Sequence, residues 1–200
     1  MSQATFTPLE SARLILRRFT DADLAAFIAY RNDPLVAKYQ SWESYSERQA
    51  AEFIRDYRNL EPGVAGTWFQ FAVELKATGA LIGDCALCVR SDATREAEIG
   101  YTLAREYQGR GYATEAVTRL LDYTCGDLGA RRVVALTDCR NAASITLLER
   151  LGLRREEHFK NVWFKGYWAE EYLYALSADE WRRNRNDFGG GVVVSDRTKE

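Results

Sequence analysis

The sequence is poor in the side chains that build metal and nucleophilic centres. Its 200 residues include one histidine, His158, and four cysteines. A Ser-His-Asp hydrolase or a site built from several histidines is therefore hard to assemble. Cys85 and Cys88 have the C-x-x-C spacing of zinc and redox sites, but they lie in an apolar, strand-like run where positions i and i+3 face opposite sides. We predict reduced, buried cysteines and no metal site.

Strong charge and long apolar runs are also missing. A net charge of −2 and a pI near 5.7 give no global attraction to nucleic acids or anionic membranes. No run approaches the ~20 apolar residues that a membrane-spanning helix needs. The first residues lack the basic and then apolar stretch of a signal peptide. We therefore expect a cytoplasmic protein that contacts neither membranes nor, directly, nucleic acids.

The length and composition fit one folded domain. Apolar residues make up 46% of the chain and charged residues 28%, enough for a sizeable core and an ordinary surface. We predict an N-terminal extension over 1–12, a single domain over 13–185 and a flexible tail over 186–200, which is glycine-rich and then polar.

Periodicity and turn signals predict a mixed α/β chain. Strands are expected at 13–19, 67–75, 80–89, 96–103, 131–137, 153–158, 162–168 and 171–176. Helices are expected after Thr20, from Ser46 to Tyr57, at 114–127, at 142–151 and from Ser177 onward. The hairpin within 67–89 favours antiparallel pairing, and the helix at 112–127 favours a crossover to a parallel neighbour. A mixed sheet with helices on both faces follows.

The segment Gln108-Gly-Arg-Gly-Tyr-Ala113 is the most informative in the chain. It joins a strand-like run to a helix-like run, and its glycines allow a tight turn. The first turn of a helix has free N–H groups and a positive dipole end, so this geometry is typical of phosphate binding. The Walker pattern is absent, and Thr114 stands where G-x-G-x-x-G needs its third small residue. Taken alone, the turn could serve only packing.

Its surroundings resemble a known family. Gln108-x-x-Gly111-x-Ala113 matches the Q/R-x-x-G-x-G/A signature of the GNAT acyltransferases. The segments 97–101, 106–116, 141–152 and 165–181 are similar to its RimJ/RimL-like branch, which includes acetyltransferases of ribosomal-protein N-termini. The resemblance covers roughly residues 10 to 182. It implies a GNAT-like α/β fold (an α+β mixed sheet): a central, mostly antiparallel twisted sheet of six to seven strands, splayed at the cofactor site, with helices on both faces.

The resemblance also implies a site for acetyl-CoA, with no metal. The CoA diphosphate would meet the backbone N–H groups of the glycine turn, and the pantetheine arm would pair with the strand before it as a β-augmentation. The implied cofactor-binding residues are Tyr101, Leu103, Gln108, Gly109, Arg110, Gly111, Tyr112, Ala113, Thr114 and Asn141. Two roles are open for Arg110, which could face the 3′-phosphate or only water. Asn141 could bind pantetheine or simply cap a helix.

Catalysis would require one group that deprotonates the amine and one that protonates the thiolate. We take Glu98 as the candidate base and Ser144 as the candidate acid. Glu98 could instead be a solvated carboxylate on a strand, and Ser144 could instead only cap a helix. Glu74 and Asp84 are weaker candidates for the base. Three tyrosines are further candidates for the acid: Tyr167, Tyr172 and Tyr174.

The implied activity is transfer of acetyl to a primary amine, either a protein N-terminus or a small-molecule amine. The alternative is a non-catalytic module that binds or senses acyl-CoA. The acceptor pocket is expected to form between residues 30–45 and 158–170. Its aromatic candidates are Tyr39, Trp42, Trp163 and Trp168, which could equally form the interface of a homodimer.

Overall fold

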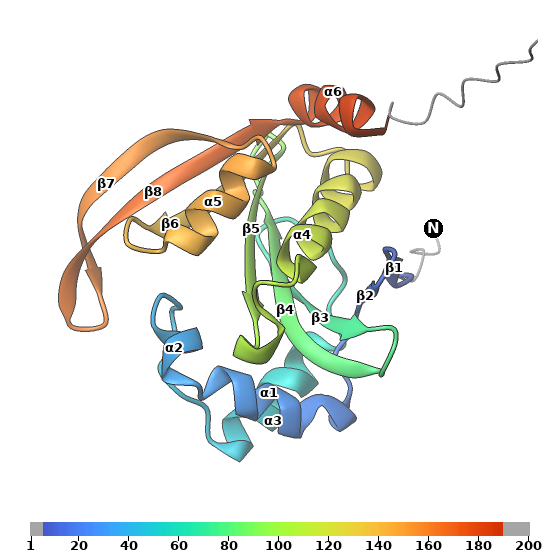
Figure 1. Cartoon of the computed structure of the whole chain (residues 1–200), viewed down its shortest axis with the longest axis vertical. Helices are drawn as coiled ribbons and strands as arrows, with labels where there is room; N and C mark the ends of the chain where they lie inside the picture. Colours follow the sequence, from blue (N-terminus) through green and yellow to red (C-terminus); the bar gives the residue numbers. More distant parts are fainter. Residues whose placement is uncertain (1–5, 190–200) are drawn as a thin grey trace, which may run out of the picture.

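The computed structural model describes the backbone of residues 6–189 and the side chains of residues 6–185, so residues 190–200 of the expected tail lie outside the described residues (Figure 1). One sheet holds all described strands, in the order β1-β2-β3-β4-β5-β6-β8-β7. The strands are β1 Leu9–Glu10, β2 Leu14–Arg17, β3 Trp68–Leu75, β4 Ala80–Val89, β5 Glu96–Leu103, β6 Arg132–Asp138, β7 Arg154–Phe164 and β8 Tyr167–Ser177.

The helices lie between and after these strands. They are α1 Leu24–Arg31, α2 Pro34–Ala37, α3 Glu47–Tyr57, α4 Tyr112–Asp122, α5 Ala142–Arg150 and α6 Ala178–Gly189, with 3-10 turns at Asp21–Asp23 and Arg105–Tyr107 and a π turn at Tyr123–Asp127. Helix α6 runs past residue 185, where the sequence placed the start of the tail. None of the described helices is long and apolar enough to cross a membrane.

The predicted mixed, mostly antiparallel sheet is confirmed. Of the pairs between described strands, β5–β6 is parallel and the others are antiparallel. The sheet has eight strands instead of six or seven. The three strands expected over 153–176 are the two long strands β7 and β8. Their turn is at Lys165 and Gly166, which both have positive φ, and the expected break near residue 160 is a bulge at Asn161 (φ 59°).

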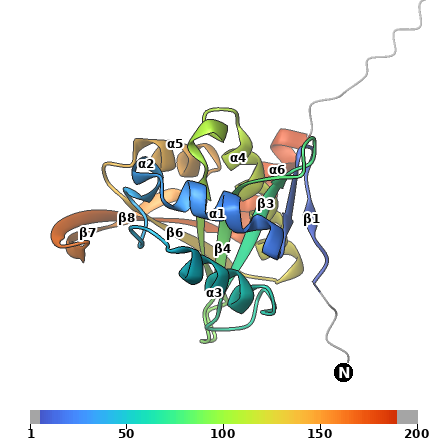
Figure 2. The same ribbon diagram turned by 90° about the horizontal axis from the view of Figure 1, so that it is seen from below.

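Helices cover both faces of the sheet, as predicted (Figures 1 and 2). On one face, α4, α5 and α6 bury Leu120, Leu148 and Trp181 against β3 to β6 and β8. On the other face, α1 and α3 bury Phe27 and Ile54 over the β3–β4 part of the sheet. The β7–β8 hairpin extends beyond this covered part.

Strands β5 and β6 pair over only three residues each. Residues 96–98 pair with residues 132–134, and beyond them β5 continues along β4 while β6 continues along β8. The facing edges of residues 99–103 and 135–138 therefore separate, and their backbone groups face a gap. This is the splay that the family resemblance implied.

Candidate active site

A groove of about 790 Å³ opens where β5 and β6 separate. Its walls come from both strands and from the starts of α4 and α5, and α2 contributes Leu35 and Val36. This volume lies within the usual range for ligand pockets. The sequence-predicted residues that line the groove are Tyr101, Leu103, Gln108, Gly109, Gly111, Ala113, Thr114, Asn141 and Ser144. Arg110, Tyr112 and Glu98 lie outside this lining.

The glycine turn has the backbone that the sequence predicted. Gly109 (φ 72°) and Gly111 (φ 79°) both adopt the left-handed region, which disfavours other residues. Gln108 Nε2 donates to the Leu103 carbonyl at 2.9 Å, so this side chain fixes the turn to the end of β5. The amide of Glu115 donates back to the Gly111 carbonyl at 3.1 Å. The amides before Glu115 are at the free end of α4, where they can meet an anion.

Arg13, which the sequence did not indicate as a site residue, lies beside this turn. Its Nη1 donates to the Arg110 carbonyl at 3.1 Å, and its guanidinium lies 4.4 Å from the centre of the Tyr112 ring. Its Nε pairs with Glu115 at 2.6 Å. Burial pushes the pKa of Glu115 up, but hydrogen bonds from Arg13 and Ser11 outweigh it and leave the pKa below its ordinary value. An Arg13–Glu115 ion pair therefore lies beside the free amides of the turn.

Asn141 caps the N-terminus of α5, which is one of the two roles that the sequence left open for it. Its Oδ1 accepts from the Ser144 amide at 3.2 Å. The loop before it is held by Asp138, whose carboxylate accepts from the Arg140 amide at 2.8 Å and whose carbonyl accepts from the Asn141 amide at 2.9 Å. Among the described residues, Asn141 Nδ2 has no hydrogen-bond partner. Capping and ligand binding are thus compatible, because they use different atoms of one side chain.

Tyr101 and Ser144 form a hydroxyl pair in the groove, 2.8 Å apart. Burial raises the pKa of Tyr101 to about 12, so the phenol holds its proton at neutral pH. The sequence indicated a role only for the backbone of Tyr101, and this contact was not predicted. Strand alternation places Tyr101 on the same side as Ile99 and Leu103, which pack in the core beneath α4 and α5. That pattern could have indicated that its hydroxyl faces α5.

Glu98 lies at the point where the strands separate, paired with Val134. It is three residues from Tyr101, so the two side chains face opposite sides of the sheet. Burial, together with the nearby charges of Glu96 and Glu171, raises the pKa of Glu98. Burial and Asp138 also raise the pKa of Glu171. Glu98 and the Tyr101–Ser144 pair therefore lie on opposite faces of the sheet, and of the two predicted catalytic residues only Ser144 lines the groove.

The weaker base candidates are engaged in ion pairs away from the groove. Glu74 pairs with Arg17, which also binds Asp23. Asp84 is 3% exposed and accepts from Arg31 at 2.8 Å and from the buried Tyr30 hydroxyl. Each carboxylate connects two elements, since Glu74 joins β3 to β2 and Asp84 joins β4 to α1.

The alternative tyrosine acids also point elsewhere. Tyr174 donates to Glu149 at 2.9 Å, and Tyr167 accepts from Arg140 at 3.1 Å. Tyr172 packs against the His158 ring with 4.9 Å between centroids. None of these three tyrosines lines the groove, where Tyr101 is the tyrosine that meets Ser144.

The α2 region contacts the β7–β8 hairpin near the mouth of the groove. Lys165 Nζ donates to the Ala37 carbonyl at 2.8 Å, and the Tyr39 hydroxyl donates to the Arg140 carbonyl at 3.2 Å. The segments 30–45 and 158–170 therefore touch at Lys165, but of the two only 30–45 contributes to the groove lining, and an acceptor pocket between them stays a prediction. Trp42 is not a free pocket wall, because it stacks on the Arg31 guanidinium at 3.7 Å.

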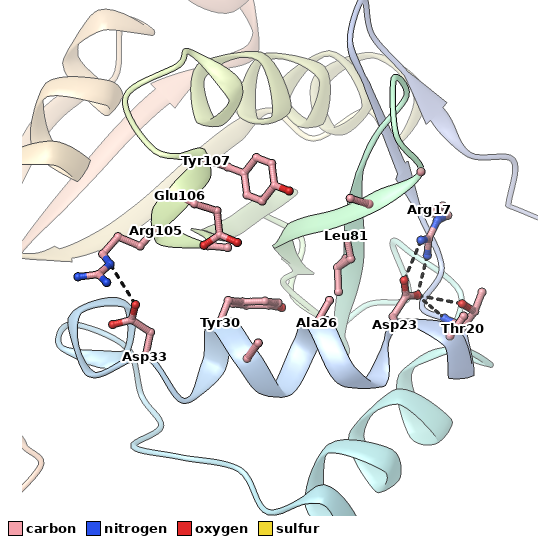
Figure 3. Close-up of a pocket in the computed structure, with 15 residues that line it drawn as sticks. Arg17, Thr20, Asp23, Ala26, Tyr30, Asp33, Leu81, Arg105, Glu106 and Tyr107 are labelled. Atoms are coloured by element: carbon pink, nitrogen blue, oxygen red, sulfur yellow. Dashed lines mark hydrogen bonds and ion pairs between the residues drawn. The ribbon is translucent and has the colours of Figure 1, made fainter.

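A second cavity, of about 420 Å³, lies between α1 and the β4 and η2 region, where η2 is the 3-10 turn Arg105–Tyr107 (Figure 3). Its charged groups are largely paired with one another. Arg17 binds Asp23 at 2.7 Å, and Arg105 binds Asp33 at 3.3 Å. None of the residues that the sequence assigned to catalysis or cofactor binding lines this cavity, although Tyr30 and Asp33 belong to the segment 30–45 that was expected near the acceptor. The splayed groove is therefore the candidate active site.

Comparison with known proteins identifies the family of the chain. Residues 13–154 match the family model for the acetyltransferase (GNAT) domain. The chain is 31% identical over 175 residues to the uncharacterized N-acetyltransferase p20 of Bacillus licheniformis, covering 86% of this chain and 97% of that protein. It is 27% identical over 169 residues to the putative ribosomal N-acetyltransferase YdaF of Bacillus subtilis, covering 80% and 88%.

Solved structures agree with the fold. A GNAT-family acetyltransferase from Bacillus anthracis matches with a TM-score of 0.78 and 26% identity, over 87% of this chain and all of that one. RimJ of Mycobacterium smegmatis, solved in complex with CoA-disulfide, matches with a TM-score of 0.76 and 24% identity, over 88% and 89%. In that structure the CoA derivative is bound to the Mycobacterium smegmatis protein.

Proposed function

The chain belongs to the GNAT family of acetyltransferases, in its RimJ/RimL-like branch, and we propose that it transfers acetyl from acetyl-CoA directly to a primary amine. The acceptor is a protein N-terminus or a small-molecule amine. The single observation that carries the proposal is the splay of β5 from β6 beside the left-handed glycine turn. We further propose that the protein works in the cytoplasm, as a monomer or a homodimer.

We propose that the groove and the glycine turn beside it hold a CoA molecule from its diphosphate to its thiol. The amides of 109–114 and the Arg13 guanidinium provide the positive end for the diphosphate. The unpaired edge of β5 near Tyr101 and Leu103 offers backbone groups to the two amides of pantetheine, and Asn141 Nδ2 adds a donor from the opposite wall. Bound acetyl-CoA would supply an activated thioester at the end of this path.

Proton transfer would use the groups on the two sides of the gap. Glu98 would accept the proton of the incoming ammonium, and its raised pKa brings it closer to neutrality, where a general base is more effective. The Tyr101–Ser144 pair would supply a proton to the departing thiolate, with Ser144 as the donor and Tyr101 positioning it. A backbone N–H on β5 would donate to the thioester oxygen as negative charge develops there.

The test is thiol release from acetyl-CoA in the presence of a panel of amines that includes N-terminal peptides and polyamines. We expect release that depends on one amine class and falls in the Ser144→Ala and Glu98→Gln variants. CoA binding without release for any amine would favour the non-catalytic acyl-CoA sensor. If the wild-type chain does not bind CoA, both the acetyltransferase and the acyl-CoA sensor are contradicted.

A further inference from the structure

Three metal-ligand side chains from separate segments meet at the outer part of the sheet. They are Cys139, just after β6, His158 on β7 and Glu170 on β8, and their ligand atoms all lie within 4.8 Å of one another. His158 Nε2 lies 2.5 Å from Glu170 Oε2, and Cys139 Sγ donates to the Glu170 carbonyl at 2.9 Å. The Tyr172 ring packs against the imidazole.

We propose that Cys139, His158 and Glu170 form a binding site for a zinc-like divalent cation. Thiolate, imidazole and carboxylate are the three ligand types of zinc sites, whereas calcium and magnesium take oxygen ligands. Three protein ligands leave a fourth tetrahedral position for water. On binding, the Cys139 thiol proton leaves to solvent and the sulfur bonds to the ion.

The distances require only small movements. Bonds of about 2.0 to 2.3 Å to a tetrahedral ion hold its ligand atoms roughly 3.5 Å apart. The His158–Glu170 contact of 2.5 Å must therefore lengthen by about 1 Å, and no other separation in the cluster exceeds 4.8 Å, so none must shorten by more than roughly 1 Å. Glu170 is half-exposed and His158 is about a third exposed, so both side chains have room to rotate. His158 and Glu170 are already in contact, and a small separation of the two side chains would let both bind the ion.

A bound ion would add a cross-link at one edge of the sheet. In the described sheet β7 pairs with β8 alone, and its register shifts on both sides of His158. The ion would connect both strands of this hairpin to the β6–α5 loop that carries Arg140 and Asn141. If the proposed transfer reaction is correct, the ion would also stabilise the mouth of the groove, where Lys165 meets α2.

The experiment measures metal binding directly, without acetyl-CoA. The full chain, freed of any polyhistidine tag and treated with chelator, is titrated with Zn²⁺ by calorimetry and with Co²⁺ by absorption. We expect one ion per chain and a thiolate-to-cobalt charge-transfer band. Absence of binding, or binding without that band, would overturn the site.

Variants locate the ion within the chain. Cys139→Ser and His158→Gln should each weaken Zn²⁺ binding by at least roughly tenfold and Cys139→Ser should abolish the cobalt band. Cys88→Ser is the matched control, because this cysteine is partly buried like Cys139 but lies outside the cluster, and the affinity of this variant for Zn²⁺ should be unchanged. Unchanged affinity in both cluster variants would overturn the proposal. His158 is exposed, so its variant tests the site even if Cys139→Ser fails to fold. These outcomes are independent of whether acetyl transfer occurs.

Discussion

Gly111 offers a direct test of the diphosphate site, because a carboxylate placed there would face the same amides as the phosphates. In the Gly111→Asp variant, the new Cβ would lie 3.4 Å from Arg13 Nη2, so it fits without a severe clash. The backbone φ of 79° costs a residue with a side chain about 1–2 kcal/mol of folding free energy. The chain should therefore fold, with a moderately lower melting temperature.

The effect on binding should be larger than the effect on folding. Two negative charges about 5 Å apart repel by about 3 kcal/mol at an effective dielectric constant of about 20. Arg13 offsets part of this repulsion, but it is already paired with Glu115. We expect the Kd for CoA, measured by calorimetry, to rise at least roughly 100-fold, since each 1.4 kcal/mol corresponds to about a tenfold change.

Two matched variants separate charge from backbone strain. Gly111→Asn has nearly the same shape, tolerates positive φ and carries no charge, so its Kd should rise less than about tenfold. Gly129→Asp places the same carboxylate at a left-handed glycine (φ 65°) that does not line the groove, and CoA affinity should not change. An unchanged Kd in Gly111→Asp, or equal losses in the aspartate and asparagine variants, would refute the assignment of the diphosphate to this turn.

Three further predictions concern the gap and the core. Ser144→Ala should lower kcat by roughly 100-fold with little change in the Kd for CoA. Tyr101→Phe should lower kcat less, because the phenol acts through the serine. Equal kcat in the wild type and both variants would contradict the role of Ser144 as the acid. The raised pKa of Glu98 means that its folded form holds a proton more tightly, so its effect on stability is most favourable below pH 4.5 and is lost as pH rises through the folded pKa. Glu98→Gln should therefore raise the melting temperature at pH 7 and remove the acidic limb of the rate profile, and a lower melting temperature at pH 7 would argue against the burial. Asp84→Ala leaves the Arg31 charge buried and should cost about 3–5 kcal/mol in urea unfolding, and a loss below about 1 kcal/mol would show that the pair is not buried.

Local features were predictable from the sequence. The glycine turn and the start of α4 depend on adjacent residues, and Gly109 and Gly111 indicate a backbone that other residues resist. The hairpin of β3 and β4 has a similarly local signal at Gly79. The sequence predicted one strand across Lys165 and Gly166, where the structure has a turn. The residues on both sides of this turn are aromatic, so the pattern typical of a strand continues through it.

The rest depends on contacts between distant residues. Arg13 reaches a turn almost a hundred positions away, and Tyr101 meets a helix that follows a crossover. The same limitation applies to the side chains of the proposed cation site. A single histidine argued against a metal site, but the fold brings His158 to a cysteine and a glutamate from two other segments.

The most direct measurement of the central claim is a crystal structure of the chain bound to CoA. We predict the diphosphate on the amides of 109–114 beside Arg13, pantetheine between β5 and β6, and the sulfur near Ser144. A CoA molecule held elsewhere, for example in the cavity beside α1 shown in Figure 3, with β5 and β6 free of ligand, would contradict the assignment of the groove.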